Sequence, residues 1–355
     1  MSNISQFLGG SDRKVSARLI LRSQTFIAPI SGMYRISVIG GGASGGVSVV
    51  GSTGQTATGG GAGGFAQKSV YLKQGDSLTV NVGAGGMKSS NGNGVDGGQS
   101  SVAGPAGLLI QADGGKAGRA AGWGTPLTGS EGGAATGGDI NNPGGGSGGI
   151  NLSTAGSAAT GGGAVNIFGV DPETIRSGSA VATYSTGGAS PGGGSDGGGV
   201  QASAGGGVAG PSVGGIPGPD ILGRVPGSSP FDVSELPQFG SENIFVPLER
   251  LVIVPPFFLV GGGGYVNKTT RGFALFSGGA SGGVYTESNM TGIFGPQPSG
   301  AFAGSGGLVS IGSGSTGASL SEGAEFGAGA GGVVSRVSAT SRGGDGIVVI
   351  EVPLK

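Results

Sequence analysis

A chain of 355 residues in which 90 are glycine cannot fill a conventional hydrophobic core along its whole length, because glycine has no side chain to bury. Charged residues make up only 10% and the formal net charge is −1, which argues against the basic face of a nucleic-acid-binding protein. Hydrophobic residues still account for 35%, more than a disordered chain carries, so we expect the chain to fold.

Cysteine and histidine are both missing from the sequence. Their absence removes disulfides, the usual zinc ligands and the commonest general base. A serine or threonine nucleophile would need a lysine or carboxylate base, and no Asp/Glu pair lies in a context typical of a glycosidase. We therefore predict a protein that is not an enzyme and that holds no cofactor and no metal.

No stretch has the pattern of a transmembrane helix. The best candidate, residues 248–260, is short, carries Glu249 and Arg250, and contains Pro255 and Pro256. The first ten residues lack the apolar region of a secretory signal. We expect a protein that is made in the cytoplasm, is not embedded in a membrane and works outside the cell after lysis.

The chain opens with a short peptide, residues 1–12, in which Ile4, Phe7 and Leu8 form a small apolar group. This peptide is either an attachment segment or a disordered tail. The next stretch, VSARLILRS, is apolar but is interrupted by Arg18 and Arg22. Charges of this kind protect the edge of a sheet, so we predict an edge strand and not a phosphate-binding patch.

The clearest strand pattern covers residues 33–39, where apolar side chains at the even-numbered positions alternate with polar ones. Residues 25–28 are extended, and Pro29 to Gly32 predict a turn between the two strands. Further strands are indicated at residues 65–71, 77–82 and 108–112. The patterns at residues 77–82 and 108–112 stop at a glycine cluster, and the pattern at residues 65–71 is followed by a turn at residues 73–76.

The stretch FIAPISGMYRISVIGGGASGG, residues 26–46, resembles the opening of the glycine-rich proteins of bacteriophage tails. More distantly, it is similar to the glycine-rich extracellular domain of the anaplastic-lymphoma type of receptor kinase. Residues 59–86, 135–149 and 343–352 fit the same pattern. The resemblance thus covers most of the first 150 residues and the last dozen. Residues 216–260 depart from it.

Residues 132–215 form a glycine-rich insertion with bursts such as 144–146, 161–163 and 197–199. A strict Gly-X-Y period is missing, so collagen is a poor interpretation. One alternative is a flexible linker. The other is a bundle of extended, polyglycine-II-like helices, whose bare backbones come close enough to hydrogen-bond to one another. Alanine, valine and isoleucine interleave with the glycines, and this favours the bundle.

Residues 216–260 form a proline-rich and aromatic inserted module, and residues 261–342 return to glycine with short strands. The last pattern, IVVIEV at residues 347–352, is so apolar that we expect a central strand. The predicted fold is all-β. It is a discontinuous β-sandwich of the jelly-roll or TNF-like type, built from residues 13–131 and 343–355, with the glycine-rich parts inserted between them.

The resemblance implies a virion tail protein. We expect a tail-fibre or tail-tip adhesin that contacts a host polysaccharide or outer-membrane protein, binds other phage tail proteins, and is present as a homotrimer or in several copies. The alternative is a purely structural tail or baseplate component. A bacterial surface adhesin and a polysaccharide depolymerase are weaker alternatives, because an export signal and catalytic residues are not evident.

Aromatic side chains could stack on sugars or dock on a receptor protein. We select those in the glycine-rich and inserted regions as receptor-contact candidates; for each of them a local core role is the alternative. The candidates are Phe168, Tyr184, Phe231, Phe239, Tyr265, Tyr285 and Phe294. Ile4, Phe7 and Leu8 are the candidates for attachment to the virion.

Overall fold

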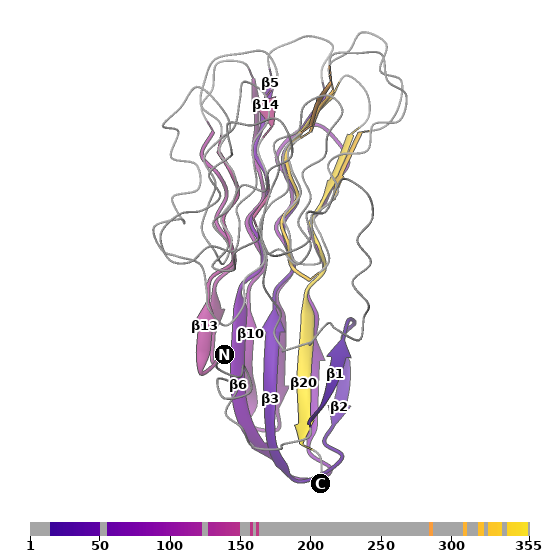
Figure 1. Ribbon diagram of the computed structural model, residues 1–355, viewed down its shortest axis with the longest axis vertical. Helices are drawn as coiled ribbons and strands as arrows, with labels where there is room; N and C mark the ends of the chain where they lie inside the picture. The colour runs from indigo at the N-terminus through magenta and orange to yellow at the C-terminus, as the bar shows by residue number, and fades with distance from the viewer. Residues whose placement is uncertain are drawn as a thin grey trace, which may run out of the picture.

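The computed structural model describes residues 15–49, 55–122, 127–149, 157–158, 161–162, 284–286, 308–310, 319–322, 326–335 and 339–353. Every regular element within these ranges is a β-strand, which confirms the all-β prediction. None of these residues belongs to a helix that could cross a membrane. Figure 1 shows an elongated arrangement in which broad strands lie at one end and narrow extended segments run from them to the other.

Two five-stranded antiparallel sheets form the broad end, which we name the base (Figure 1). The first sheet has the strand order β1 (Val15–Ile20), β20 (Ile347–Pro353), β3 (Gly32–Ile39), β6 (Phe65–Leu72) and β13 (Ile140–Asn142). The second has the order β12 (Ala135–Thr136), β10 (Gly107–Ala112), β9 (Ser100–Gly104), β7 (Ser77–Asn81) and β2 (Gln24–Ile27). These strands include those that were expected between residues 15 and 112.

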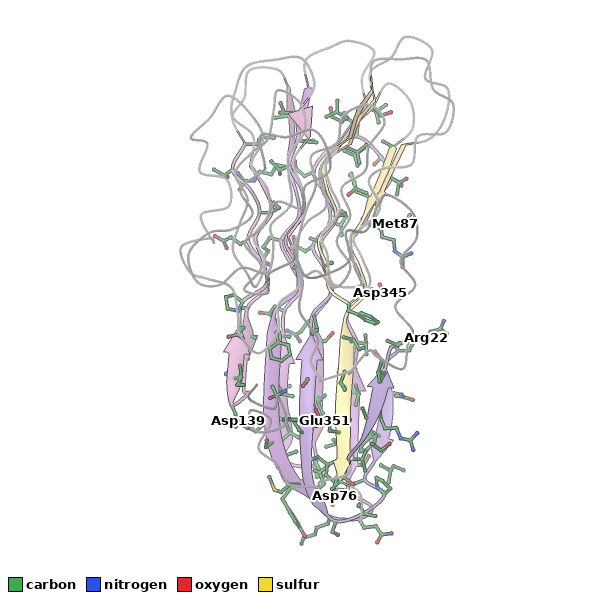
Figure 2. All side chains as sticks on the ribbon, in the orientation of Figure 1. Arg22, Asp76, Met87, Asp139, Asp345 and Glu351 are labelled. Atoms are coloured by element: carbon green, nitrogen blue, oxygen red, sulfur yellow. The ribbon has the colours of Figure 1, made fainter. Side chains whose placement is uncertain are left out.

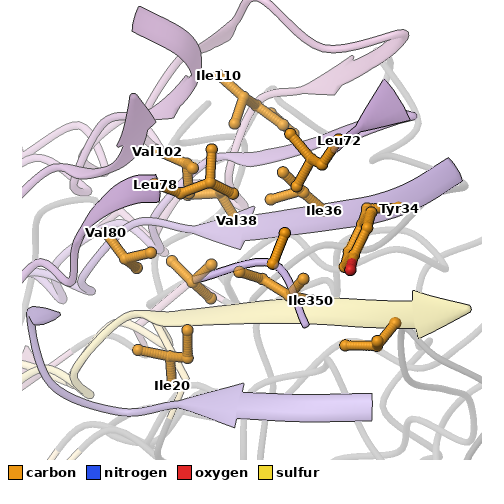
Figure 3. Close-up of a cluster of buried hydrophobic side chains, with 14 of the residues drawn as sticks. Ile20, Tyr34, Ile36, Val38, Leu72, Leu78, Val80, Val102, Ile110 and Ile350 are labelled. Atoms are coloured by element: carbon orange, nitrogen blue, oxygen red, sulfur yellow. The ribbon is translucent and has the colours of Figure 1, made fainter. Parts of the chain in front are cut away.

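One hydrophobic core lies between the two sheets. Tyr34, Ile36 and Val38 of β3 point into it, as their alternation predicts, and they meet side chains of the second sheet such as Leu78 (Figure 3). Burying each aliphatic side chain of this size stabilises the fold by roughly 1.5–3 kcal/mol. The Tyr34 hydroxyl remains satisfied inside the core because it donates a hydrogen bond to the Ile30 carbonyl at 2.7 Å.

The last strand, β20, is inserted between β1 and β3, so the prediction of a central C-terminal strand is confirmed. Val348 and Ile350 are fully buried in the core. The strand β1 pairs only with β20 and lies at the sheet edge, as the interrupting arginines indicated. The base therefore cannot close until the two ends of the chain have met.

An ion pair joins β20 to β3 on the opposite face of the first sheet. Arg35 donates from Nη2 to Glu351 Oε2 at 2.5 Å, and the two residues are direct partners in the register. Glu351 is only 3% exposed, whereas the Arg35 side chain is 47% exposed. The second carboxylate oxygen of Glu351 is buried without a hydrogen-bond partner.

Extended glycine-rich segments continue directly from the base strands (Figure 1). Residues 40–46 leave β3, residues 58–64 lead into β6, and residues 343–346 lead into β20. We name the set of these segments the glycine column. It consists of residues 40–46, 58–64, 82–86, 92–99, 113–119, 127–134, 143–149, 161–162, 327–332 and 343–346.

Short strands lie beyond the column, toward the end opposite the base, which we name the distal end (Figure 1). They are β4 (Val47–Val49), β5 (Gln55–Ala57), β8 (Met87–Lys88), β11 (Ala120–Gly122), β14 (Ser157–Ala158), β15 (Val284–Thr286), β16 (Leu308–Ser310), β17 (Ser319–Glu322), β18 (Val333–Ser335) and β19 (Ala339–Arg342). Several pair in parallel, including a sheet of order β15-β16-β18-β4.

The base also takes strands from the region that the sequence assigned to the glycine-rich insertion. The strands β12 and β13 fall within residues 132–215, and they close one edge of each sheet. The attachment peptide, residues 1–12, and the inserted module, residues 216–260 with its strand expected at residues 251–260, lie outside the described residues.

Candidate functional site

Most of the residues proposed for recognition lie outside the described ranges. Tyr285 falls in β15, for which the structure describes the backbone. The remaining receptor-contact candidates, Phe168, Tyr184, Phe231, Phe239, Tyr265 and Phe294, and the attachment candidates Ile4, Phe7 and Leu8 lie outside the described residues. The candidate site that the structure does describe is the glycine column together with the distal strands above it.

Residues 40–46 run through the middle of the column. Their backbone N–H groups donate hydrogen bonds to three neighbouring segments in turn. Every third residue returns to the same neighbour. Gly40, Ala43 and Gly46 donate to Gly64, Gly61 and Thr58 at 2.9–3.0 Å; Gly41, Ser44 and Val47 donate to Gly98, Val95 and Gly92 at 2.8–3.1 Å; and Gly42 donates to Gly344 at 2.8 Å. The choice of hydrogen-bond partner therefore repeats every three residues.

The carbonyl groups of the same segment accept from three further segments. Gly115 and Gly118 donate to Gly41 and Ser44, Ala330 and Val333 donate to Ala43 and Gly46, and Gly86 donates to Gly42, all at 2.8–3.0 Å. Residues 40–46 thus have six hydrogen-bonded neighbours. A buried backbone without such partners would be strongly unfavourable, so this network is what allows a core with almost no side chains.

Close packing of these backbones explains the glycines. A methyl group at Gly42 would come within 1.9 Å of the carbonyl oxygen of Ala328, and one at Gly115 within 1.9 Å of that of Gly61. Among the described glycines, a positive φ occurs at Gly75, Gly92, Gly107, Gly137 and Gly327. Residues 40–46 are not in that set, so glycine is needed there for space and not for an unusual backbone conformation.

Hydroxyl groups substitute for backbone carbonyls where a neighbouring segment does not align. Ser341 Oγ accepts from Gly45 N at 2.8 Å and donates to the Gly331 carbonyl at 2.9 Å. In the same way, Thr58 Oγ1 accepts from Arg119 N at 2.8 Å. These side chains are buried or partly buried, and each one completes the hydrogen bonding of a neighbouring segment.

Charged and polar side chains leave the column on its outer segments, again at every third position. Exposed examples are Asn93, Asp96 and Gln99, then Lys116 and Arg119, and then Thr128 and Glu131. Lys116 Nζ lies 3.1 Å from Asp96 Oδ2, but both side chains are more than half exposed, so this ion pair adds little stability. This spacing is the sequence signal for a three-residue turn.

The described side chains offer little reactive chemistry. Groups of three or more residues able to hold a metal ion are not found among them. The most buried carboxylate of the base, Glu351, already pairs with Arg35.

Two distal strands, β14 and β15, flank the longest stretch of the chain between described strands. Connections at the base are short: residues 28–31 join β2 to β3, residues 73–76 join β6 to β7, and residues 105–106 join β9 to β10. Residues 161–162 of the column belong to the much longer stretch between β14 and β15. Five of the receptor-contact candidates belong to it: Phe168, Tyr184, Phe231, Phe239 and Tyr265.

Comparison with known proteins adds no assignment. A scan against protein-family models gives no match, and a search of curated proteins gives none either. The function of the chain must therefore be argued from its own residues and geometry.

Proposed function

We propose that this chain is a bacteriophage tail protein, of the tail-fibre or tail-tip adhesin type, that contributes to recognition of the host surface. The observation that carries the proposal is the hydrogen-bonded glycine column, which separates the compact base from the short distal strands. A hydrogen-bonded spacer between the base and a separate set of strands suits a protein that presents contacts at a distance. The sequence resemblance points to the same class.

The column itself is best interpreted as a bundle of polyglycine-II-like helices. Such helices have three residues per turn, rise about 3.1 Å per residue and lack internal hydrogen bonds. Both the return to the same neighbour at every third residue and the six surrounding segments support this. Amide exchange should then be slow at residues 144–149 and 161–162, which are buried, and exchange at random-coil rates would contradict the bundle.

The base fits a sandwich of the jelly-roll or TNF-like type. Its first and last strands are neighbours, and the chain passes from one sheet to the other between β1 and β2, between β2 and β3, and between β6 and β7. In this assignment the glycine-rich segments are long insertions between sandwich strands.

The partners that follow from this role are other phage tail proteins at the attachment end and a polysaccharide or outer-membrane protein of the host at the distal end. We place the protein in the virion tail, after synthesis in the host cytoplasm, and in a non-enzymatic role. Several copies on one tail would strengthen attachment, because weak contacts on one rigid support act together.

Binding to host cells tests the proposal. Purified chain should bind cells that are sensitive to the phage encoding it, and it should reduce phage adsorption. Tyr285→Ala and Phe294→Ala should weaken both effects. Tyr71→Ala is the matched control, because this side chain is 59% exposed on the base strand β6, and it should leave both unchanged. Failure of the correctly folded wild-type chain to bind would favour a purely structural tail or baseplate component.

A further inference from the structure

Two Asn–Gly dipeptides, Asn91–Gly92 and Asn93–Gly94, lie at the exposed rim of the column. Asn–Gly is the dipeptide most prone to spontaneous deamidation, because glycine leaves its own backbone nitrogen unshielded. In that reaction the glycine nitrogen attacks the asparagine side-chain carbonyl carbon. The new N–C bond forms as the amide C–N bond breaks and ammonia leaves, and water then opens the succinimide to aspartate or isoaspartate.

Hydrogen bonds within the column fix both reacting groups, the glycine nitrogen and the asparagine side chain. Gly92 N donates to the Val47 carbonyl at 2.7 Å, and Gly94 N donates to the Gly118 carbonyl at 2.8 Å. A nitrogen held in this way cannot turn toward the side chain that precedes it. The glycine nitrogen is therefore not available to attack at either dipeptide.

The side chains are fixed as well, and by different segments. Asn91 Oδ1 accepts from Val49 N at 3.1 Å, and Asn93 Oδ1 accepts from Ala120 N at 3.0 Å. Each asparagine thus caps an N–H group at the rim, while its neighbouring glycine is bonded elsewhere. Asp96–Gly97 follows the same arrangement: Asp96 Oδ1 accepts from Ala117 N at 2.7 Å and Gly97 N donates to Gly115 at 3.0 Å.

We propose that Asn91 and Asn93 are latent deamidation sites, unreactive while the column is closed and modified once it opens. The consequence of modification is specific to this architecture. An isoaspartyl linkage adds one carbon to the backbone, so a segment that meets a different neighbour at each of three successive residues loses its register. Deamidation would then prevent the opened column from closing again, whatever role the column serves.

The test is to age the full chain in mildly alkaline buffer beside a synthetic peptide of residues 89–98. The tryptic peptide that covers residues 89–116 contains both sites, and mass spectrometry with isoaspartate-specific fragmentation follows each of them. The folded chain should deamidate at Asn91 and Asn93 roughly tenfold or more slowly than the peptide, because reaction requires local opening. Equal rates would overturn the proposal.

A pair of glycine variants links the protection to the column. A methyl group at Gly118 would meet the Thr58 carbonyl oxygen at 2.3 Å, whereas none of the surrounding atoms lies within 4 Å of one at Gly122. Gly118→Ala should accelerate deamidation at Asn93, and Gly122→Ala should not. Unchanged protection in a Gly118→Ala chain whose column amides exchange rapidly would contradict the proposal. If that variant does not fold, the comparison of folded chain with peptide still decides.

Discussion

At Gly42 a neighbouring carbonyl oxygen occupies the place where a side chain would begin, and most glycines of the column are in the same position. The residue type is therefore set by packing between backbones. At Phe326 the backbone conformation is the unusual feature. Its φ is 63°, which non-glycine residues rarely adopt, and its side chain packs against the apolar cluster of Ile39 and Phe65. Composition alone predicts neither the close contacts nor this strained aromatic.

Gly42→Ala should lower the free energy of unfolding by about 2 kcal/mol or more, because overpacking of a rigid interior costs about 1–3 kcal/mol and the colliding atom is backbone. Gly122→Ala is the control, since its surroundings are open, and should stay within about 0.5 kcal/mol of the wild type. Urea denaturation followed by circular dichroism measures both. Equal stability of the two variants would show that the column relaxes around a methyl group.

The ion pair between Arg35 and Glu351 gives a second prediction at this scale. Arg35→Met should cost about 2 kcal/mol, because it leaves a buried carboxylate unpaired, although the exposure of Arg35 reduces the loss. Replacing both residues, as Arg35→Met with Glu351→Leu, should recover most of this stability, since an apolar pair has no desolvation cost. A double-mutant cycle in urea measures the coupling, and additive losses would contradict the argument.

Among the elements, the strands of the base could be predicted from alternation, as at residues 33–39, or from a continuous apolar run, as at residues 347–352, each bounded by glycine. The parallel strands β15, β16 and β18 could not, because three residues are too few for a period to appear. Their common signal is a Gly-Gly pair directly before each strand, which also precedes β4 at residues 45–46. That signal can be recognised only once the register, which aligns Val284, Leu308 and Val333, is known.

Deleting residues 346–355 should prevent folding. The strand β20 supplies buried side chains, and it is hydrogen-bonded to β1 on one side and to β3 on the other. The appropriate control removes only Leu354 and Lys355, which follow the strand, and should leave the circular dichroism spectrum native. Solubility and the spectrum of both truncations check the prediction. A soluble, native-like chain without β20 would show that the first sheet closes in another way.

On the scale of the whole molecule, the column joins parts of the chain that are far apart in sequence. Gly42 donates to Gly344, and Gly45 donates to Ser341, which lies 296 residues away. The sequence favours close packing of the glycine-rich segments, but it does not say which of them are neighbours, because their bare backbones look alike. The base strands resolve the ambiguity, since each one fixes where its segment enters the column.

The edges of the base are the surfaces at which copies of the chain could meet. Arg18 and Arg22 are exposed along the edge formed by β1 and β2, while Asp139 is exposed beside β13 at the other edge; Figure 2 labels Arg22 and Asp139 on opposite sides. Opposite charges on opposite edges favour contact between one edge of a copy and the other edge of the next, an arrangement that closes into a ring.

Charge exchange tests this assembly. If the proposed homotrimer forms through these edges, Arg18→Glu with Arg22→Glu should shift the chain toward monomer in light scattering after gel filtration, with the largest effect at low salt, where exposed charges are least screened. Adding Asp139→Lys to the same chain should restore part of the oligomer, because the attraction returns with its sign reversed on both edges. Arg119→Glu is the control, since this exposed charge lies on the column and not on an edge strand of the base. A reversed-charge chain that assembles like the wild type would place the contact between copies on another surface, and a monomeric wild type would remove the basis for a ring.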